Sequence, residues 1–193
     1  LYPSIIMTLG VSPETKVTKI ENFDGHKFVK KQGTHYSDGW NGWETADDLQ
    51  KYLTDNKYSI AANGVVYDTK IKGFLPSILD NWFNERVEYK NLRKKYEKEG
   101  DDVKAEYYDR MQLVTKILLN SFYGVLGNPG FRFFDPDNAT AITSTGQQLI
   151  KFTADIGNQF YTKELGKKED YNIYIDTDSV FFSSLPLIEK RYP

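Results

Sequence analysis

The sequence contains no cysteine, and only two of its 193 residues are histidines, His26 and His35. The absence of cysteine excludes disulfide bonds and thiolate metal sites. Two histidines in a polar, glycine-rich stretch also argue against a histidine-based zinc centre. Any bound metal must therefore be held by oxygen atoms, which favours a hard cation such as magnesium.

Long apolar runs and a strong overall charge are also missing. No run approaches the ~20 apolar residues that a membrane-spanning helix needs, and nothing at the start resembles a signal peptide. The formal net charge is -2, so binding to nucleic acid would have to depend on local clusters of cations. We expect a soluble, cytoplasmic protein without a membrane partner. Because the chain opens directly in an apolar run at Leu1, we also expect it to be a piece of a longer protein.

The first 70 residues are predicted to form short strands and hairpins. An apolar run at residues 1–9 predicts a strand that ends in a loop. Asp24-Gly25 and Asn63-Gly64 are each typical of a tight hairpin turn. Between them, residues 46–56 predict a short helix with Thr45 as its cap. Nothing in residues 17–67 indicates chemistry.

Residues 71 to about 99 have the period of a helix with one apolar side. Arg86, Lys90 and Arg93 follow one another at i, i+4 and i+7 beside that side, so three cations share a face. Such a row is usually solvated and neutralised by neighbouring glutamates; the alternative is that it binds phosphates. A turn at residues 99–102 then predicts a long antiparallel helical hairpin.

The second helix of this hairpin carries the stretch KILLNSFYGVLGN at residues 116–128. At ~100° per residue, Lys116, Asn120, Tyr123 and Gly127 fall within an arc of roughly 60°. A solvated polar face explains this arc about as well as a platform for a planar, anionic ligand. If the hairpin closes, Arg86 and Lys90 can approach Lys116 and form a polyphosphate site. The opposite side is predicted to be core and comprises Val103, Tyr107, Met111, Val114 and Leu118.

The last third of the chain predicts a helix followed by a strand hairpin. Residues 139–165 form an amphipathic pattern whose apolar positions are expected to cover a sheet: Ile142, Leu149, Ile150 and Phe160. Two β-prone runs, residues 172–175 and 179–182, then flank Asp176-Thr177-Asp178 and predict a tight antiparallel hairpin of buried strands. A turn stabilised by its own aspartate is the common explanation of this triplet. A carboxylate pair framed by strands is also what a divalent cation site needs.

Three of these stretches resemble the motifs of the family B (α-like) DNA polymerases, most closely the bacteriophage branch. LYPSII at residues 1–6 resembles the latter part of motif A, KILLNSFYG at residues 116–124 resembles motif B, and YIDTDS at residues 174–179 resembles motif C. Each pattern alone is short and has false positives. Their joint occurrence in the family's order is highly specific and spans essentially the whole chain.

The resemblance implies an α+β fold, in which a palm of antiparallel β-sheet and helices is interrupted by a helical hairpin called the fingers. The expected parts are residues 1–70 for the first part of the palm with inserted hairpins, 71–127 for the fingers, and 128–193 for the rest of the palm. It also implies an enzyme that extends a primer on template DNA with deoxynucleoside triphosphates, assisted by two magnesium ions.

The resemblance further implies roles for individual residues. Asp178 and, less firmly, Asp176 are expected to be metal ligands, while Lys116, Arg86 and Lys90 are expected to bind the triphosphate. Asn120 and Tyr123 would face the nascent base pair. Tyr2 resembles the steric gate that excludes a 2′-hydroxyl, although on its own it is equally a half-buried strand aromatic. Backbone amides near Leu1 and Tyr2 would help to hold the phosphates.

One departure from the family pattern limits what this chain can do. The aspartate of motif A would precede Leu1, so we expect the 193 residues to be inactive in synthesis on their own. One alternative is a non-catalytic nucleotide- or DNA-binding module that retains the cationic hairpin. Another is a chain that associates with itself through exposed apolar palm surfaces.

Overall fold

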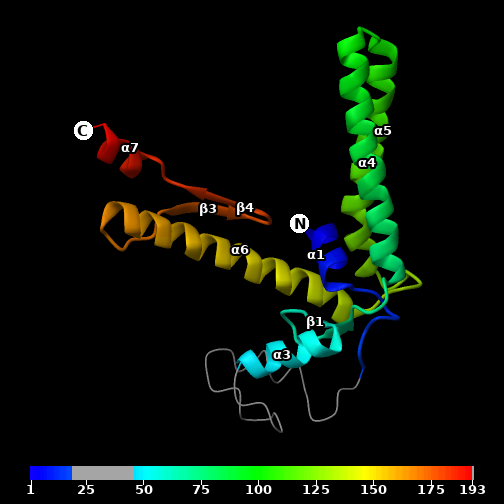
Figure 1. Cartoon of the computed structure of the whole chain (residues 1–193), viewed down its shortest axis with the longest axis horizontal. Coiled ribbons are helices and arrows are strands. Elements are labelled where there is room, and N and C mark those ends of the chain that lie inside the picture. The colour runs from blue at the N-terminus through cyan, green and yellow to red at the C-terminus, as the bar shows by residue number, and fades with distance from the viewer. Residues whose placement is uncertain (19–45, 193) are drawn as a thin grey trace. The chain divides into compact units, whose positions relative to one another are not determined.

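A computed structural model of the chain, shown in Figure 1, describes residues 1–18 and 46–192. The predicted turn at Asp24-Gly25 and the cap residue Thr45 lie outside this part. The contacts divide the chain into two compact units, one of residues 2–142 and one of Leu1 with residues 143–193. Helices and small antiparallel sheets make up both, so the predicted α+β class is confirmed. No helix among the described residues has the length and apolarity to cross a membrane.

The first element is a helix, α1 (Tyr2–Leu9), and the predicted strand is wrong. Ile5 and Ile6 are both buried although they are neighbours, which a strand with one buried face would not allow. They are buried because α1 packs against the helices α4 and α5 described below. Pro3 is compatible with this helix because proline is tolerated in the first turn.

The hairpin predicted at Asn63-Gly64 is confirmed. Helix α3 (Ala46–Asn56) leads into strand β1 (Tyr58–Ile60), which pairs antiparallel with β2 (Val66–Asp68). Gly64 has a φ of 90°, a conformation that glycine adopts at no steric cost. The side chain of Asn63 accepts a hydrogen bond from the Val65 amide at 3.2 Å. The turn residues therefore set the register of this small sheet.

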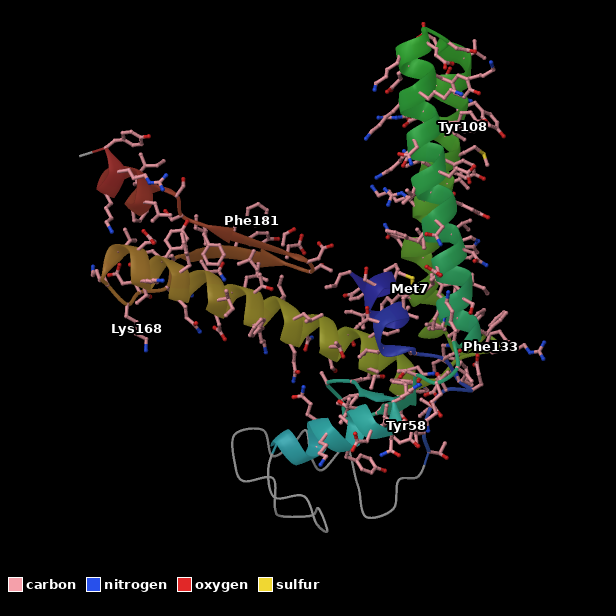
Figure 2. All side chains as sticks on the ribbon, viewed as in Figure 1. Met7, Tyr58, Tyr108, Phe133, Lys168 and Phe181 are labelled. Atoms are coloured by element: carbon pink, nitrogen blue, oxygen red, sulfur yellow. The ribbon has the colours of Figure 1, made fainter. Side chains whose placement is uncertain are left out.

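The predicted helical hairpin consists of α4 (Phe74–Glu99) and α5 (Asp102–Leu126), which we call the helical arm. Figure 1 shows the two helices running side by side in opposite directions. Gly100 ends α4 in the left-handed region with a φ of 74°, and the Asp101 side chain caps α5 by accepting from the Lys104 amide at 3.0 Å. Aromatic pairs fill the seam between the helices: Trp82 with Phe122, and Tyr89 and Tyr96 with Tyr108, labelled in Figure 2.

The apolar side predicted for the core of α5 is wrong. Val103 is 81% exposed, and Tyr107, Val114 and Leu118 are exposed as well. The buried side of α5 is instead formed by Ala105, Thr115, Leu119, Phe122 and Leu126. The helix thus carries two apolar stripes, and the buried one includes Phe122 and lies beside Tyr108, whose rings pack on the aromatic side chains of α4.

Helix α6 (Pro136–Leu165) is followed by β3 (Asn172–Asp176), β4 (Ser179–Phe182) and α7 (Leu185–Arg191). The strands pair antiparallel, as predicted. In the second unit, the Tyr161 ring on α6 stacks between Tyr171 and Phe182 at centroid distances of 5.0 and 5.5 Å. A Cβ on Gly157 would lie 2.0 Å from the Phe182 ring, so only glycine lets that ring approach α6.

Two predictions about this region are wrong. Leu149 and Phe160 do not cover the sheet, because both are exposed, while Gly157 and Tyr161 form the contact. The strands are also not buried, since most of their residues, among them Ile173 and Tyr174, are exposed. The physical reason is that the described sheet has only two strands and places a single face on α6.

Candidate nucleotide and metal site

The two aspartates of motif C lie at the tip of the β3–β4 hairpin. Asp176 is paired with Ser179, so Thr177 and Asp178 form a two-residue turn. Thr177 has a φ of 42°, which is uncommon for a β-branched residue. Its hydroxyl donates to the Asp176 carboxylate at 3.0 Å. Both carboxylates are exposed, so the turn presents them to solvent.

These donors fit a hard divalent cation in their chemistry, because both are carboxylate oxygens. They are too few for a complete site, since no group of three or more acidic or histidine residues suited to a metal occurs in the described ranges. Leu1 belongs to the same unit, and its amino nitrogen lies 3.8 Å from a carboxylate oxygen of Asp178. The turn therefore offers part of an oxygen site.

The cations of the helical arm divide into paired and unpaired groups. Arg93 donates to Asp109 across the seam at 3.0 Å and lies 3.6 Å from Glu97, so it is committed to the fold. Among the described residues, no ion pair involves Arg86, Lys90 or Lys116. The Nε atom of Arg86 is buried and has no hydrogen-bond partner in that part of the chain. These three cations are therefore available to bind an anion that comes from outside the arm.

Helix geometry places these three cations on one side of the arm. Arg86 and Lys90 flank the seam on α4, and Lys116 and Asn120 flank it on α5, all rotated in the same sense from the buried residues. Because the two helices are antiparallel, equal rotations from the seam lead to the same side. Lys116 and Asn120, two residues of the arc described on α5, are both exposed, whereas Tyr123 is half-buried.

The structure brings two of the predicted site residues into direct contact. The ring of Tyr2 on α1 lies 4.6 Å, centroid to centroid, from the ring of Tyr123 on α5. Both side chains are half-buried. Tyr2 is thus held from a helix rather than a strand, beside a residue of the polar arc, and the pair leaves part of each ring accessible.

Residues 12–16, which we call the 12–16 loop, hold the start of α4. Gly73, the residue before α4, has no side chain to cap it, and the loop supplies the cap. The Glu14 carboxylate accepts from the Phe74 amide, and the Ser12 hydroxyl accepts from the Leu75 amide at 3.4 Å. Burial alone would raise the pKa of Glu14, but the hydrogen bonds from Ser12 and Phe74 outweigh it and lower that pKa. A Cβ on Gly73 would lie 2.6 Å from Ser12.

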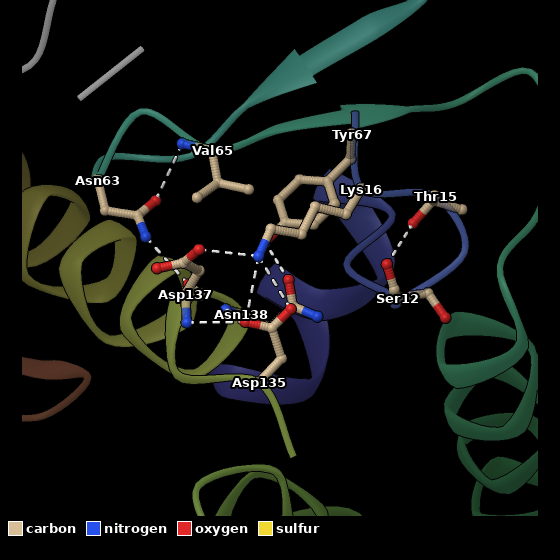
Figure 3. A network of polar contacts seen from close by, with 9 residues as sticks. All are labelled: Ser12, Thr15, Lys16, Asn63, Val65, Tyr67, Asp135, Asp137 and Asn138. Atoms are coloured by element: carbon tan, nitrogen blue, oxygen red, sulfur yellow. Dashed lines mark hydrogen bonds and ion pairs between the residues drawn. The ribbon is translucent and has the colours of Figure 1, made fainter. Parts of the chain in front are cut away.

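The same loop also holds the start of α6, as Figure 3 shows. The Lys16 ammonium lies 2.9 Å from Asp135 and 2.8 Å from Asp137. Burial opposes the charge of Lys16, yet its pKa is raised because both carboxylates bind the ammonium. Next to it, the buried Tyr67 hydroxyl donates to Asn138 at 2.8 Å. Burial, then the charges of Asp135 and Asp137, raise the pKa of Tyr67 far above its usual range.

The sequence analysis missed the 12–16 loop because its partners lie 60 to 121 residues away. One local signal was available. Asp135 followed by Pro136 is a typical helix start, with an acidic cap and proline in the first position, and α6 does begin at Pro136.

Comparisons with known proteins match almost the whole chain. The family model described as DNA polymerase family B matches residues 1–185. A DNA-directed DNA polymerase of Escherichia phage RB69 is 25% identical over 98% of this chain and 24% of its own length. That of Enterobacteria phage T4 is 29% identical over 98% and 25%, and a DNA polymerase of Thermococcus gorgonarius is 28% identical over 96% and 18%. The chain thus spans about a quarter of the length of the phage relatives.

Proposed function

The chain belongs to DNA polymerase family B, and from this premise we propose that it supplies the nucleotide-binding face and part of the metal site of a template-directed DNA polymerase. The observation that carries the proposal is the unpaired set Arg86, Lys90 and Lys116, which shares one side of the helical arm. Other cations of the arm, such as Arg93 and Arg110, are bound to carboxylates of the arm itself.

We assign the helical arm to the fingers, expected at residues 71–127, and residues 1–70 and 128–193 to the palm. In this assignment the three cations bind the triphosphate of an incoming deoxynucleotide by charge-assisted hydrogen bonds. Arg86 offers a guanidinium that suits bidentate contact with phosphate oxygens. Lys90 and Lys116 add mobile point charges, and Asn120 faces the nascent base pair.

Tyr2 and Tyr123 are assigned to the sugar and base of the nucleotide. Their ring contact holds Tyr2 in place without burying it, which supports its role as a steric gate against a 2′-hydroxyl. In the longer protein, Tyr2→Ala is expected to admit ribonucleotides, whereas Tyr2→Phe keeps the ring and should keep the selectivity. Unchanged sugar selectivity of Tyr2→Ala in primer extension would remove this role.

Asp176 and Asp178 are assigned to magnesium, with at least one further ligand needed. The exposed turn and its oxygen donors support this assignment, and Thr177 restrains the Asp176 carboxylate through its hydroxyl. When bound, magnesium neutralises charge on the triphosphate and activates the primer hydroxyl. The primer and its template are the expected macromolecular partners, and we expect the 193 residues alone to lack synthesis activity.

The decisive experiment compares Lys116→Ala with Lys95→Ala in the longer protein. Lys95 is a matched control because it lies on the same arm but pairs with Glu99. Loss of one charge-assisted phosphate contact is expected to cost on the order of 1.5–3 kcal/mol, seen as a higher Michaelis constant for the deoxynucleotide. Steady-state primer extension measures this change, and equal constants for the two variants would contradict the proposal.

A second candidate is a nucleotide-binding module without catalysis, which the incomplete oxygen site favours. The two candidates differ in the role of Asp178. If the chain serves catalysis, Asp178→Ala abolishes synthesis by the longer protein. If it only binds, triphosphate affinity of the 193 residues survives Asp178→Ala and no synthesis depends on it.

Association of the chain with itself is a third proposal, supported by exposed apolar side chains on the β3–β4 hairpin, namely Ile173, Tyr174 and Phe181. Sedimentation velocity over a range of concentrations tests it. Ile173→Thr with Phe181→Thr should then shift the population to monomer, and a wild-type chain that is monomeric throughout would refute it.

A further inference from the structure

Lysines and glutamates lie on different faces of the outer part of α4. The proposed nucleotide site involves only one of these lysines. From position 83 to the end of α4, five residues fall within an arc of roughly 80° that turns outward from the edge of the α5 seam, at ~100° per residue: Phe83, Val87, Lys90, Lys94 and Lys98. We call these five residues the outer ridge. Of them, only Lys90 has a role in the proposed nucleotide site.

Within the ridge there is no acidic residue. Glu85, Glu88 and Glu99 gather on another side of α4 by the same helical geometry, and Glu97, at the edge of the ridge, pairs with Arg93 at 3.6 Å. In the described part of the chain, no ion pair is recorded for Lys90, Lys94 or Lys98. The lysines are exposed, and Lys94 and Lys98 line a groove with Asn91, Lys95 and Glu99, of which Glu99 pairs with Lys95.

The row of lysines lowers the stability of α4. Like charges four residues apart repel one another on a helix surface, and the ridge contains two such pairs, Lys90 with Lys94 and Lys94 with Lys98. Lys98 has a local compensation, because it lies in the last turn where the helix dipole favours a cation. Lys90 and Lys94 have none, which is typical of positions that serve a partner.

Two exposed apolar residues continue the same ridge toward the base of the arm. Phe83 and Val87 are each 44% exposed. Exposed aromatic rings beside a row of cations suit single-stranded nucleic acid, whose bases can stack on a ring while the cations follow the phosphates. A duplex keeps its bases stacked inside and would leave Phe83 without a contact.

We propose that the outer ridge of α4 binds single-stranded DNA, with Lys94 and Lys98 contacting backbone phosphates and Phe83 contacting a base. The proposal rests on the proposed function only for the choice of nucleic acid as the polyanion. It assigns to the arm a binding surface that runs from Phe83 to Lys98 along α4 and shares only Lys90 with the triphosphate site.

The test is the salt dependence of binding by the 193-residue chain. Fluorescence anisotropy with a short labelled oligothymidylate gives the dissociation constant at several salt concentrations. The double variant Lys94→Gln/Lys98→Gln removes two phosphate contacts and is expected to lower the slope of log affinity against log salt by about 1.4. Glutamine is a good helix former, so the arm stays folded, which circular dichroism checks.

A matched control removes the same charge elsewhere on the arm. Lys104→Gln/Arg110→Gln changes two cations of α5 that pair with Asp101 and Glu106, and its slope should equal that of the wild type. An equal loss of slope in both double variants would reduce the effect to overall charge and overturn the proposal. So would an unchanged slope in Lys94→Gln/Lys98→Gln, or a wild-type chain that does not bind.

Two further measurements test whether the partner is single-stranded. They also distinguish this inference from the nucleotide site. Phe83→Ala should weaken binding about fivefold or more without changing the slope, and no loss would overturn the base contact. A blunt duplex that binds as tightly as the oligothymidylate would overturn the preference for single strands. Because no nucleotide is present, this assay can fail while the Lys116 result stands, and the reverse.

Discussion

The helical arm and the β3–β4 hairpin both reverse the chain through a residue in the left-handed backbone region, but they use different residues to do so. Gly100 has a φ of 74° and no Cβ, and a Cβ added there would meet nothing within 4 Å. Thr177, with a φ of 42°, is β-branched and carries a conformational cost that glycine would avoid. The arm is therefore closed by the residue that suits the turn, whereas the strand hairpin keeps a strained one between two carboxylates. Strain of this kind is typical of functional sites.

The two hairpins also differ in what supports them. The arm is held along its length by a seam of aromatic side chains, and its first turn is capped by Ser12 and Glu14. The strand hairpin rests on α6 through one contact surface, centred on Gly157 and Tyr161. Support spread over many contacts tolerates single changes, and support concentrated at one glycine does not.

The largest expected effect comes from Gly157→Ala. The new methyl group would lie 2.0 Å from the Phe182 ring, and the overlap is expected to cost about 2–3 kcal/mol of unfolding free energy. Gly124→Ala in α5 is the control, because a Cβ there would meet nothing within 4 Å. Helix propensity alone should stabilise that variant by up to about 1 kcal/mol. Urea denaturation measures both. Equal effects of the two substitutions would remove the contrast between concentrated and distributed support.

Lys16→Met should have the next largest effect, because it leaves Asp135 and Asp137 without the cation between them. The Lys16 ammonium and its two carboxylates are partly exposed. We therefore expect the unfolding free energy to fall by about 1–2 kcal/mol, between the values for surface and buried ion pairs. The folded pKa of Lys16 is raised, so its contribution is complete below the unfolded value near 10.5 and is lost as the pH rises through the folded pKa. Wild type and Lys16→Met should therefore converge in stability at strongly alkaline pH, as followed by thermal melting.

Substituting each of the two turn residues, Gly100 and Thr177, tests the comparison of their backbone conformations. Gly100→Ala places a Cβ in the left-handed region and should destabilise the arm by about 1 kcal/mol. Thr177→Gly relieves the same conformation and should stabilise the chain by about 0.5 kcal/mol, although it removes the hydroxyl that binds Asp176. The comparison is supported if chemical denaturation gives a lower unfolding free energy for Gly100→Ala and a higher one for Thr177→Gly. A loss of stability in both variants would show that Thr177 is not strained.

Glu14→Gln is expected to have the smallest effect, about 0.3–0.5 kcal/mol at neutral pH, since the carboxylate that caps α4 is exposed and solvent weakens its charge. The folded pKa of Glu14 is lowered. Its contribution is therefore present above the unfolded value of about 4.5 and is lost as the pH falls through the folded pKa. The difference between wild type and Glu14→Gln should vanish in acid. Glu88→Gln, which changes an exposed glutamate of the same helix, is the control for the loss of one negative charge.

Much of the helical arm could be predicted because its information is local. The period of residues 74–99, the glycine at position 100 and the capping Asp101 lie next to one another in the sequence. The choice of buried side on α5 could not be predicted in the same way. Val103 and Tyr107 are as apolar as Leu119 and Phe122, and only the fit of Trp82 and Tyr96 into the seam distinguishes the two sides.

The sequence by itself determined the family, the order of the three motifs, the two hairpins with their turn residues, and the absence of thiolate chemistry. These follow from residue type and short spacing, which act within a few turns of the chain. Only the tertiary structure decided that residues 2–9 form a helix, that Arg93 is bound within the arm while Arg86 is not, and that the 12–16 loop holds the first turns of both α4 and α6. Such outcomes depend on contacts between residues 16 to 121 positions apart, and the energy of those contacts is set by how the elements pack rather than by any local pattern.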